Sequence, residues 1–578
     1  MNSRRWMVFF GSLAACAAPW WASHVRTIGD HNSFLTSDSV CLLGLSLMGA
    51  LAGSRFLPDA VAPFCERSLR RWFPSPALWA LASLPLLLLA LFFMNQKVLH
   101  AFISSADEHS CYFLAECLRR GKLFVETPPL SEFFSVVHVG NKGGKWFSVY
   151  PPGWPLIWSF GLRCGISDWL NPAMSALSLV FFYFVAKKLF SRSAAGLGFA
   201  LTALSPFFLF TGASYFSHGT CLLAISVFLW AFVEWQRTES ETGRVVWAGI
   251  AAFAVGYGLM TRYLTMAAVA GPFLLYHFLH CLEHTGRSSG TTGVSWVLGW
   301  RLKLRRSEWV FVSVVLAFML LILWQNYQVS GTPLKAPNKY DKSWERLGFK
   351  RGHYTPVDGF FYLLARIFYL MDWFAPPIVG AYLFLIFRKP CGLREDKRSR
   401  FSLQTIFSLT PVFLALAYFL YYSWGGNQWG PRYWWEGMPF LAVAVADRLV
   451  RMWRERGVRV QKFILVFIAA SFASSGILFA KHAEFTEEAS RQRRALYDAA
   501  VKTTQGPAIV FIKGFLGDKL VMSEDDAVRN SPFLNGPILY AHDLGPRNGE
   551  LKKYFPDRTF YRGTYDREKN RAVIERIV

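Results

Sequence analysis

Residues 77–97 read ALWALASLPLLLLALFFMNQK, an apolar run broken by almost no charge. A helix of about 20 residues crosses a hydrocarbon core of about 30 Å. Runs of similar length recur along the chain, in place of the 3.6-residue apolar stripes of surface helices. The stretch therefore predicts a membrane span, and its recurrence predicts an all-α polytopic membrane protein.

Working outward from this run, we predict thirteen spans, in agreement with a composition that is 53% hydrophobic and 17% aromatic. The first follows Arg4 and Arg5 and is longer than a signal-peptide core, so we interpret it as a retained anchor. The predicted spans are 6–24, 39–57, 77–97, 171–188, 194–213, 217–236, 245–261, 264–281, 308–327, 373–388, 402–423, 432–450 and 462–480.

The net charge of +24 would suggest nucleic-acid binding in a soluble protein. Here the basic residues gather in short loops between spans, which is typical of cytoplasmic membrane loops. The sequence therefore predicts membrane lipid as a partner and no nucleic acid. With the N-terminus inside, the basic inside loops are 58–76, 189–193, 237–244, 282–307, 389–401 and 451–461.

Three predicted outside segments are too long to be turns: 98–170, 328–372 and 481–578. The last alternates short apolar runs with Gly, Pro and Asn turns, which indicates a small α/β domain. The predicted organisation is an N-terminal transmembrane hairpin extension (1–76), a transmembrane catalytic domain (77–480) and an extracytoplasmic C-terminal domain (481–578).

Two carboxylates, Asp107 and Glu108, follow the third span directly. Ser105 and Glu108 have the spacing of a capping box, so Glu108 has a structural interpretation beside a catalytic one. Asp107 lies near aromatic and basic segments, where a carboxylate could accept a proton from a hydroxyl group. Both are candidate catalytic residues.

Candidate substrate-binding residues lie near the same predicted surface. Lys145 and Tyr150 belong to the stretch KWFSVYPPG, which could also be a simple interfacial turn. Arg262 and Arg432 stand at outer span ends, where a guanidinium group could hold a phosphate or merely snorkel to the interface. The other two candidates are His218 and Tyr433.

Six short motifs occur in order along roughly 77–480. They are Asp107-Glu108, Ser148-x-Tyr150-Pro151-Pro152-Gly153, Lys187-Lys188-Leu189-Phe190, Ser217-His218, Thr261-Arg262-Tyr263 and Gly430-Pro431-Arg432-Tyr433. Together they resemble the GT-C superfamily of membrane glycosyltransferases, in the branch of bacterial protein O-mannosyltransferases and the lipid A aminoarabinose transferase. The resemblance implies that Asp107 is the catalytic base, that a polyprenyl-phosphate sugar is the donor, and that the anomeric configuration inverts.

The chain departs from that pattern in two places. Two extra spans precede the first outer loop, and Tyr150 stands where the family often has a Lys before the prolines. The second departure leaves open which cation holds the lipid phosphate.

Topology also indicates a lipid-linked donor, because nucleotide sugars are cytoplasmic whereas the acidic and aromatic clusters are predicted outside. The predicted acceptor is an extracytoplasmic hydroxyl of an envelope glycolipid, polysaccharide or protein, at a bacterial inner membrane. No metal-ligand spacing is recognised, and a divalent cation is left open as a cofactor. The alternatives are a lipid-linked polysaccharide ligase or polymerase that uses basic residues of 328–372, and a secondary transporter.

Overall fold

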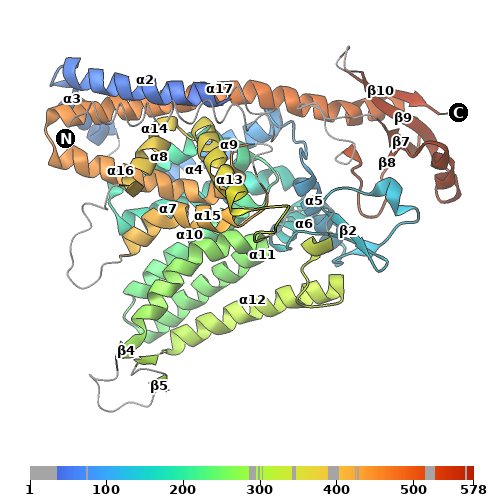
Figure 1. Cartoon of the computed structure of the whole chain (residues 1–578), viewed down its shortest axis with the longest axis horizontal. Coiled ribbons are helices and arrows are strands. Elements are labelled where there is room, and N and C mark those ends of the chain that lie inside the picture. The colour runs from blue at the N-terminus through green and yellow to red at the C-terminus, as the bar shows by residue number, and fades with distance from the viewer. Residues whose placement is uncertain are drawn as a thin grey trace.

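The structure is a computed structural model, mostly helical, in which a long bundle carries a small sheet at one end (Figure 1). A second group of strands lies at the opposite end and consists of β4 (Leu282–His284), β5 (Ser295–Trp296) and β6 (Trp300–Leu302). The described residues are 35–72, 76–284, 295–296, 300–302, 304–340, 347–387, 402–423, 425, 429–513, 527–566, 569 and 571–577.

Most helices of the bundle follow the predicted apolar runs; α3 (Val61–Trp72) and α13 (Pro356–Trp373) instead lie in segments that were predicted as loops. The run at 6–24 lies outside the described residues, and each of the other twelve falls on helical segments. The helices are α2 (Leu35–Phe56), α3 (Val61–Trp72), α4 (Pro76–Lys97), α7 (Ser167–Leu189), α8 (Arg192–Ala203), α9 (Pro206–Ala213), α10 (His218–Arg237), α11 (Glu241–His280), α12 (Arg306–Ser330), α13 (Pro356–Trp373), α14 (Pro376–Phe387), α15 (Leu403–Phe419), α16 (Met438–Glu455) and α17 (Val458–Thr503).

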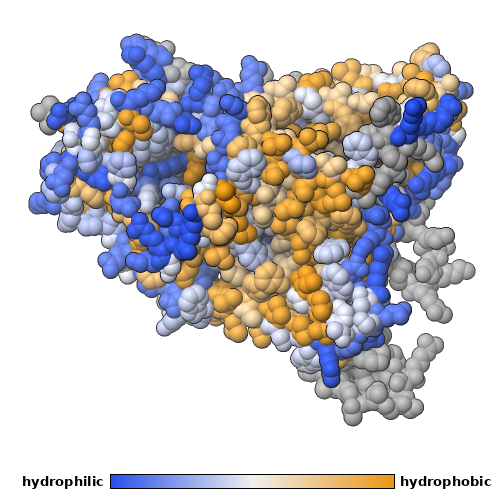
Figure 2. Space-filling model, turned by 180° about the vertical axis from the view of Figure 1, so that it is seen from behind, coloured by the Kyte–Doolittle hydropathy of each residue, from blue (hydrophilic) through white to orange (hydrophobic). Residues whose placement is uncertain are grey.

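Seven described helices are long and apolar enough to cross a membrane, and the α8–α9 pair, bent by 63°, makes an eighth candidate. The shorter helices α14 and α15 are also apolar. Figure 2 shows the matching surface, with an orange apolar zone between hydrophilic regions at either end. The chain is therefore a multi-pass membrane protein, as predicted.

Helix α11 is a hairpin rather than one straight rod. Its backbone leaves helical geometry at Arg262, with φ −148° and ψ 84°. Arg244 Nη2 and His277 Nε2 lie 3.4 Å and 3.3 Å from the same oxygen, Oε1 of Glu308. Residues this far apart in a straight helix would be separated by about 50 Å. The two arms correspond to the separate spans predicted at 245–261 and 264–281.

Helix α13 was not predicted, because the segment 328–372 was interpreted as an outer loop. Thr355 caps the helix: its side chain accepts a hydrogen bond from the Asp358 amide, and Asp358 binds back to the Thr355 amide. Pro356 occupies the first turn, where its missing N–H costs nothing. The helix packs against α2, α14 and α15, so this segment belongs to the bundle.

The C-terminal sheet has the order β10-β9-β7-β8. Strand β7 (Ala508–Ile512) is parallel to β8 (Ile538–His542) and β9 (Thr559–Asp566), and β10 (Arg571–Arg576) is antiparallel to β9. Helix α17 leads into this sheet and crosses residue 481, where the sequence suggested a domain boundary. The prediction of a small α/β unit in this region is confirmed.

The C-terminal sheet shares an apolar core with segment 98–170. That segment contains α5 (Ala106–Arg119), β1 (Val125–Glu126), β2 (Val139–Lys142), β3 (Lys145–Ser148) and α6 (Gly153–Cys164). Phe113 and Phe133 are buried together with Ile509 and Phe511 of β7. The C-terminal sheet therefore lies at the same end of the bundle as Asp107.

Candidate active site

The start of α5 fixes the position of both predicted carboxylates. The Ser105 side chain accepts a hydrogen bond from the Glu108 amide at 3.2 Å, and Glu108 Oε2 accepts one from the Ser105 amide at 3.1 Å. The predicted capping box is thus confirmed. A helix turns by about 100° per residue, so Asp107 and Glu108 point in different directions.

Glu108 points into the protein. Its Oε1 accepts a hydrogen bond from the Tyr215 amide at 2.8 Å, and its side chain is fully buried. Burial raises the pKa of this carboxyl group above its ordinary value, against hydrogen bonds that lower it. These contacts hold Glu108 as a structural group that joins α5 to the segment after α9.

Asp107 points into a cavity and has three polar neighbours. Arg432 Nη1 donates to Oδ2 at 3.0 Å, the Tyr150 hydroxyl donates to Oδ1, and His138 Nε2 lies 4.0 Å from Oδ1. Burial by itself raises the pKa of Asp107, but Arg432, His138 and Tyr150 outweigh it and hold that pKa below its ordinary value. Asp107 is therefore ionised near neutral pH.

The cavity encloses about 100 Å³ between segment 98–170 and the ends of the bundle helices. Asp107 is the one carboxylate among its described lining residues, and Arg262 and Arg432 are the guanidinium groups. The remaining lining is largely aromatic and hydroxyl-bearing: Tyr150, Phe216, Ser217, Thr261, Tyr263, Tyr418, Tyr421 and Tyr433.

Arg262 reaches this cavity because α11 folds back at that residue. Its Nε lies 3.4 Å from Glu436 Oε1, and its Nη1 donates to Ser217 Oγ at 3.3 Å. His218 Nδ1 lies 2.9 Å from the same Glu436 oxygen, and both His218 and Glu436 are fully buried. Glu436 thus fixes Arg262 from beneath the cavity.

Two further features shape the cavity. Tyr433 stacks on Tyr418, with ring centroids 4.7 Å apart and planes 2° from parallel. The guanidinium carbon of Arg432 lies 4.8 Å from the centre of the Phe216 ring. A flat aromatic floor beside guanidinium groups suits an anionic ligand with an apolar or sugar portion.

The structure brings together five of the eight predicted site residues: Asp107, Tyr150, Arg262, Arg432 and Tyr433. Glu108 and His218 lie in the buried layer next to them. Lys145, on β3, donates to the carbonyl oxygen of Gln328 and is not among the lining residues.

Three residues in or next to the cavity were not predicted from the sequence. His138 has φ 66°, an unfavourable backbone angle for a non-glycine residue, and no local pattern marks it. Tyr418 belongs to an apolar run like many others. Glu436 did carry a signal, because an acidic residue within the predicted span 432–450 is costly and suggests function.

No protein-family model matches the chain, and a search of curated proteins finds no match. Among solved structures, ArnT from Cupriavidus metallidurans bound to undecaprenyl phosphate is similar, with a TM-score of 0.51 and 12% identity over 86% of this chain and 98% of that chain. Apo ArnT gives 0.52 and 14%, over 87% and 99%. The archaeal oligosaccharyltransferase AglB from Archaeoglobus fulgidus gives only 0.36 and 12%, over 77% and 63%. The likeness to ArnT is one of fold, and at that level the predicted GT-C resemblance is confirmed.

Proposed function

We propose that this GT-C-fold protein is a membrane glycosyltransferase that moves a sugar from a polyprenyl-phosphate donor to an extracytoplasmic acceptor hydroxyl, with inversion. The observation that carries the proposal is one ionised carboxylate, Asp107, facing a cavity whose other charged groups are Arg262 and Arg432. This pairing offers a base for the acceptor and cations for a phosphate leaving group. The similar ArnT structure contains undecaprenyl phosphate, which has this leaving-group chemistry.

In the proposed reaction, Asp107 accepts the proton of the acceptor hydroxyl while the hydroxyl oxygen attacks the anomeric carbon. The bond from that carbon to the lipid phosphate breaks, and the phosphate leaves with its electron pair. One positioned base and one good leaving group suffice, so no covalent glycosyl-enzyme is required. A single displacement inverts the anomeric centre.

The ion pair between Asp107 and Arg432 indicates how donor binding would activate the base. An incoming phosphate competes with Asp107 for Arg432, because both are anions that a guanidinium fork can hold. When Arg432 turns to the phosphate, Asp107 loses its strongest cationic neighbour and its pKa rises. The base therefore becomes more effective when the donor is in place.

The other cavity residues have positioning roles in this proposal. Tyr150 donates to Asp107 and orients the carboxylate. Arg262, held by Glu436 next to His218, contributes a second cation for the phosphate, and Tyr433 offers a stacking surface. Lys145 would act indirectly, by fixing β3 to the end of α12.

The alternative function, a lipid-linked polysaccharide ligase or polymerase, was predicted from basic residues in 328–372. The described lysines and arginines of that segment are absent from the cavity lining, which favours chemistry centred on Asp107; they are Lys335, Lys339, Lys350, Arg351 and Arg366. A single carboxylate already paired with Arg432 also makes a poor cation site. We therefore expect transfer to proceed in the presence of a chelator.

We place the protein in a bacterial inner membrane, with Asp107 and the C-terminal sheet facing outward. The test is a deletion strain whose envelope glycolipids and glycoproteins are compared by mass with those of the parent. Loss of one sugar mass, restored by the wild-type gene but not by Asp107→Asn, supports the proposal and names sugar and acceptor together. Restoration by Asp107→Asn would overturn it.

A further inference from the structure

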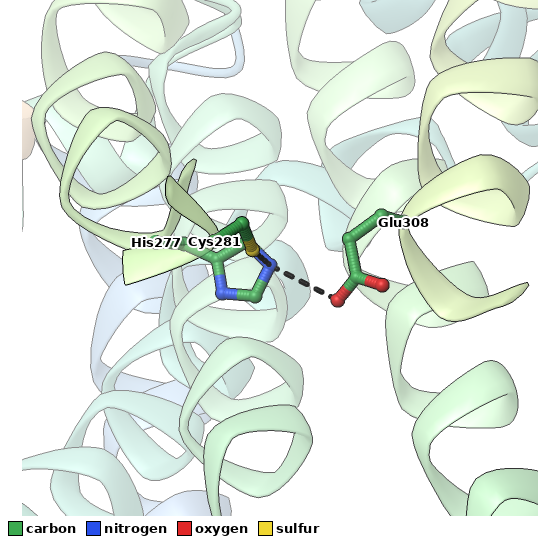
Figure 3. Close-up of side chains that lie close together, drawn as sticks. All are labelled: His277, Cys281 and Glu308. Atoms are coloured by element: carbon green, nitrogen blue, oxygen red, sulfur yellow. Dashed lines mark hydrogen bonds and ion pairs between the residues drawn. The ribbon is translucent and has the colours of Figure 1, made fainter. Parts of the chain in front are cut away.

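The far end of the α11 hairpin brings three metal-ligand side chains together. His277 and Cys281 lie one turn apart at the end of α11, and Glu308 lies in the first turn of α12. Figure 3 shows the imidazole, the thiol and the carboxylate directed toward one another. Within the described part of the chain, this is the one group of at least three such residues whose ligand atoms lie within 4.8 Å of each other.

Two of the distances between these atoms are close to those around a small tetrahedral ion. His277 Nε2 lies 3.3 Å from Glu308 Oε1 and 3.9 Å from Cys281 Sγ. Zinc bonds of about 2.0 Å to N or O and 2.3 Å to S at tetrahedral angles separate N from O by about 3.3 Å and N from S by about 3.5 Å. The three atoms could bind one ion with small side-chain movements.

Neighbouring groups form hydrogen bonds with the ligand side chains, as residues around the ligands of a metal site commonly do. Gln236 Nε2 lies 2.8 Å from His277 Nδ1, and Glu308 Oε2 accepts hydrogen bonds from the Arg305 amide at 2.7 Å and Ser307 Oγ at 3.0 Å. A half-turn of the Gln236 amide lets Nδ1–H donate to its oxygen. The Nε2 lone pair then faces a carboxylate and a thiol, an arrangement that a cation stabilises.

Arg244 is the competing cation. Its Nη2 lies 3.4 Å from Glu308 Oε1, and the cluster without metal is a buried ion pair that also includes His277. An ion would need the thiolate form of Cys281, which adds a second negative charge to balance it. Cys281 is only partly buried, so water can reach a fourth coordination position.

We propose that His277, Cys281 and Glu308 form a zinc site that ties the folded-back arm of α11 to the start of α12. Mixed N, S and O ligands at this spacing favour Zn²⁺ over the hard cations Mg²⁺ and Ca²⁺. The site lies about 27 Å along the helix from Arg262, so it is separate from the Asp107 cavity. Its expected effect is to stabilise this end of the bundle.

The test uses the full-length protein, purified in detergent through a tag without histidine. The bound zinc is measured by elemental mass spectrometry, then removed with a chelator, and Co²⁺ is added as a spectroscopic probe. The variants are Cys281→Ser and Glu308→Gln, with Cys164→Ser, an exposed free cysteine on α6, as the matched control. Size-exclusion profiles report whether each variant is folded.

We expect about one zinc per chain in the wild type and in Cys164→Ser, and thiolate-to-Co²⁺ absorption in both. Cys281→Ser should lose that absorption and bind zinc at least about tenfold more weakly. Gln236→Leu, which keeps all three ligands, should show a smaller loss. Asp107→Asn should retain its zinc whatever its activity, so this test is independent of the proposed reaction.

Zinc well below one per chain after incubation with the ion and washing would overturn the proposal. Equal binding by Cys281→Ser and Cys164→Ser would also overturn it and would identify adventitious surface binding. In either case the cluster is an ion pair of Arg244, Glu308 and His277 without a metal.

Discussion

The two ends of the α11 hairpin place similar groups in opposite electrostatic settings. At the bend, Arg262 and Arg432 line the same cavity as one carboxylate, Asp107, which is paired with Arg432. At the other end, a carboxylate faces an imidazole and a thiol, with one guanidinium nearby. The cavity at the bend is lined by two guanidinium groups and one carboxylate and suits an anionic ligand. The other end brings three ligand atoms together and suits a cation. One helical hairpin can therefore serve two unrelated kinds of site.

The largest expected effect tests the end of the hairpin at Arg262. Asp107→Asn keeps the shape of the side chain but cannot accept a proton, so transfer by the purified protein should fall about 10²- to 10⁴-fold. The measurement is release of lipid phosphate from a polyprenyl-phosphate sugar in nanodiscs. The control is Glu126→Gln, an exposed carboxylate on β1. Near wild-type turnover by Asp107→Asn would show that Asp107 is not the catalytic base.

A somewhat smaller effect is expected for Arg432→Lys, which keeps the charge but replaces a planar fork by a point charge. Donor affinity should weaken about 10- to 100-fold, if the guanidinium group holds the phosphate through two hydrogen bonds. The measurement is direct titration of donor binding in nanodiscs. Unchanged affinity would mean that Arg432 serves Asp107 alone.

The pH dependence of kcat/KM distinguishes two effects on the Asp107 pKa: the ion pair with Arg432, which lowers it, and burial, which raises it. Because Arg432 keeps the Asp107 pKa low, the acid limb of kcat/KM should lie below pH 3.8, the ordinary carboxyl value. In Arg432→Gln, burial dominates, and the limb should move upward. Because the Asp107 pKa is lowered in the folded protein, the Asp107–Arg432 ion pair stabilises the fold at pH values above the ordinary Asp pKa. This contribution is lost as the pH falls through the lowered pKa. A limb that stays in place in Arg432→Gln belongs to another group.

Glu108→Gln tests whether Glu108 differs in role from its neighbour Asp107. The substitution should lower mainly the stability of the protein. Gln can still accept from the Tyr215 amide, but the charge that several amide and hydroxyl donors share is lost. We expect a cost of about 1–2 kcal/mol in unfolding free energy, with transfer within a few-fold of wild type. Thermal denaturation and turnover on the same sample check both. A loss of turnover as large as that of Asp107→Asn would give Glu108 a catalytic role.

The smallest effect on transfer concerns the end of the hairpin that carries His277 and Cys281. Chelation of the proposed zinc should lower the melting temperature while transfer at moderate temperature stays within about twofold of the untreated protein. Cys281→Ser should behave in the same way. If transfer is abolished while the protein stays folded, the metal cluster and the Asp107 cavity are coupled through α11 and are not independent sites.

Most of the fold could be predicted from the sequence, because the length and apolarity of a span are local properties. The runs at 245–261 and 264–281 fall on the two arms of α11, and the Ser105–Glu108 spacing gave the capping box correctly. Helix α13 was missed because its apolar run is interrupted by Arg366, which the bundle buries and satisfies with the carbonyl oxygen of Tyr418. That compensation is invisible in the sequence.

The sequence by itself determined that the chain crosses a membrane repeatedly and that charged and aromatic groups gather at span ends. It also determined which Asp and Arg residues were candidates for the site. Only the tertiary structure decided which of them meet. Asp107 and Arg432 are 325 positions apart and lie 3.0 Å from each other, while Lys145, much nearer in sequence, lies off the cavity. The cluster of His277, Cys281 and Glu308 likewise needs α11 to fold back onto α12. Span formation depends on the transfer of one segment into lipid, whereas a site depends on how separate spans pack, and no single segment encodes that packing.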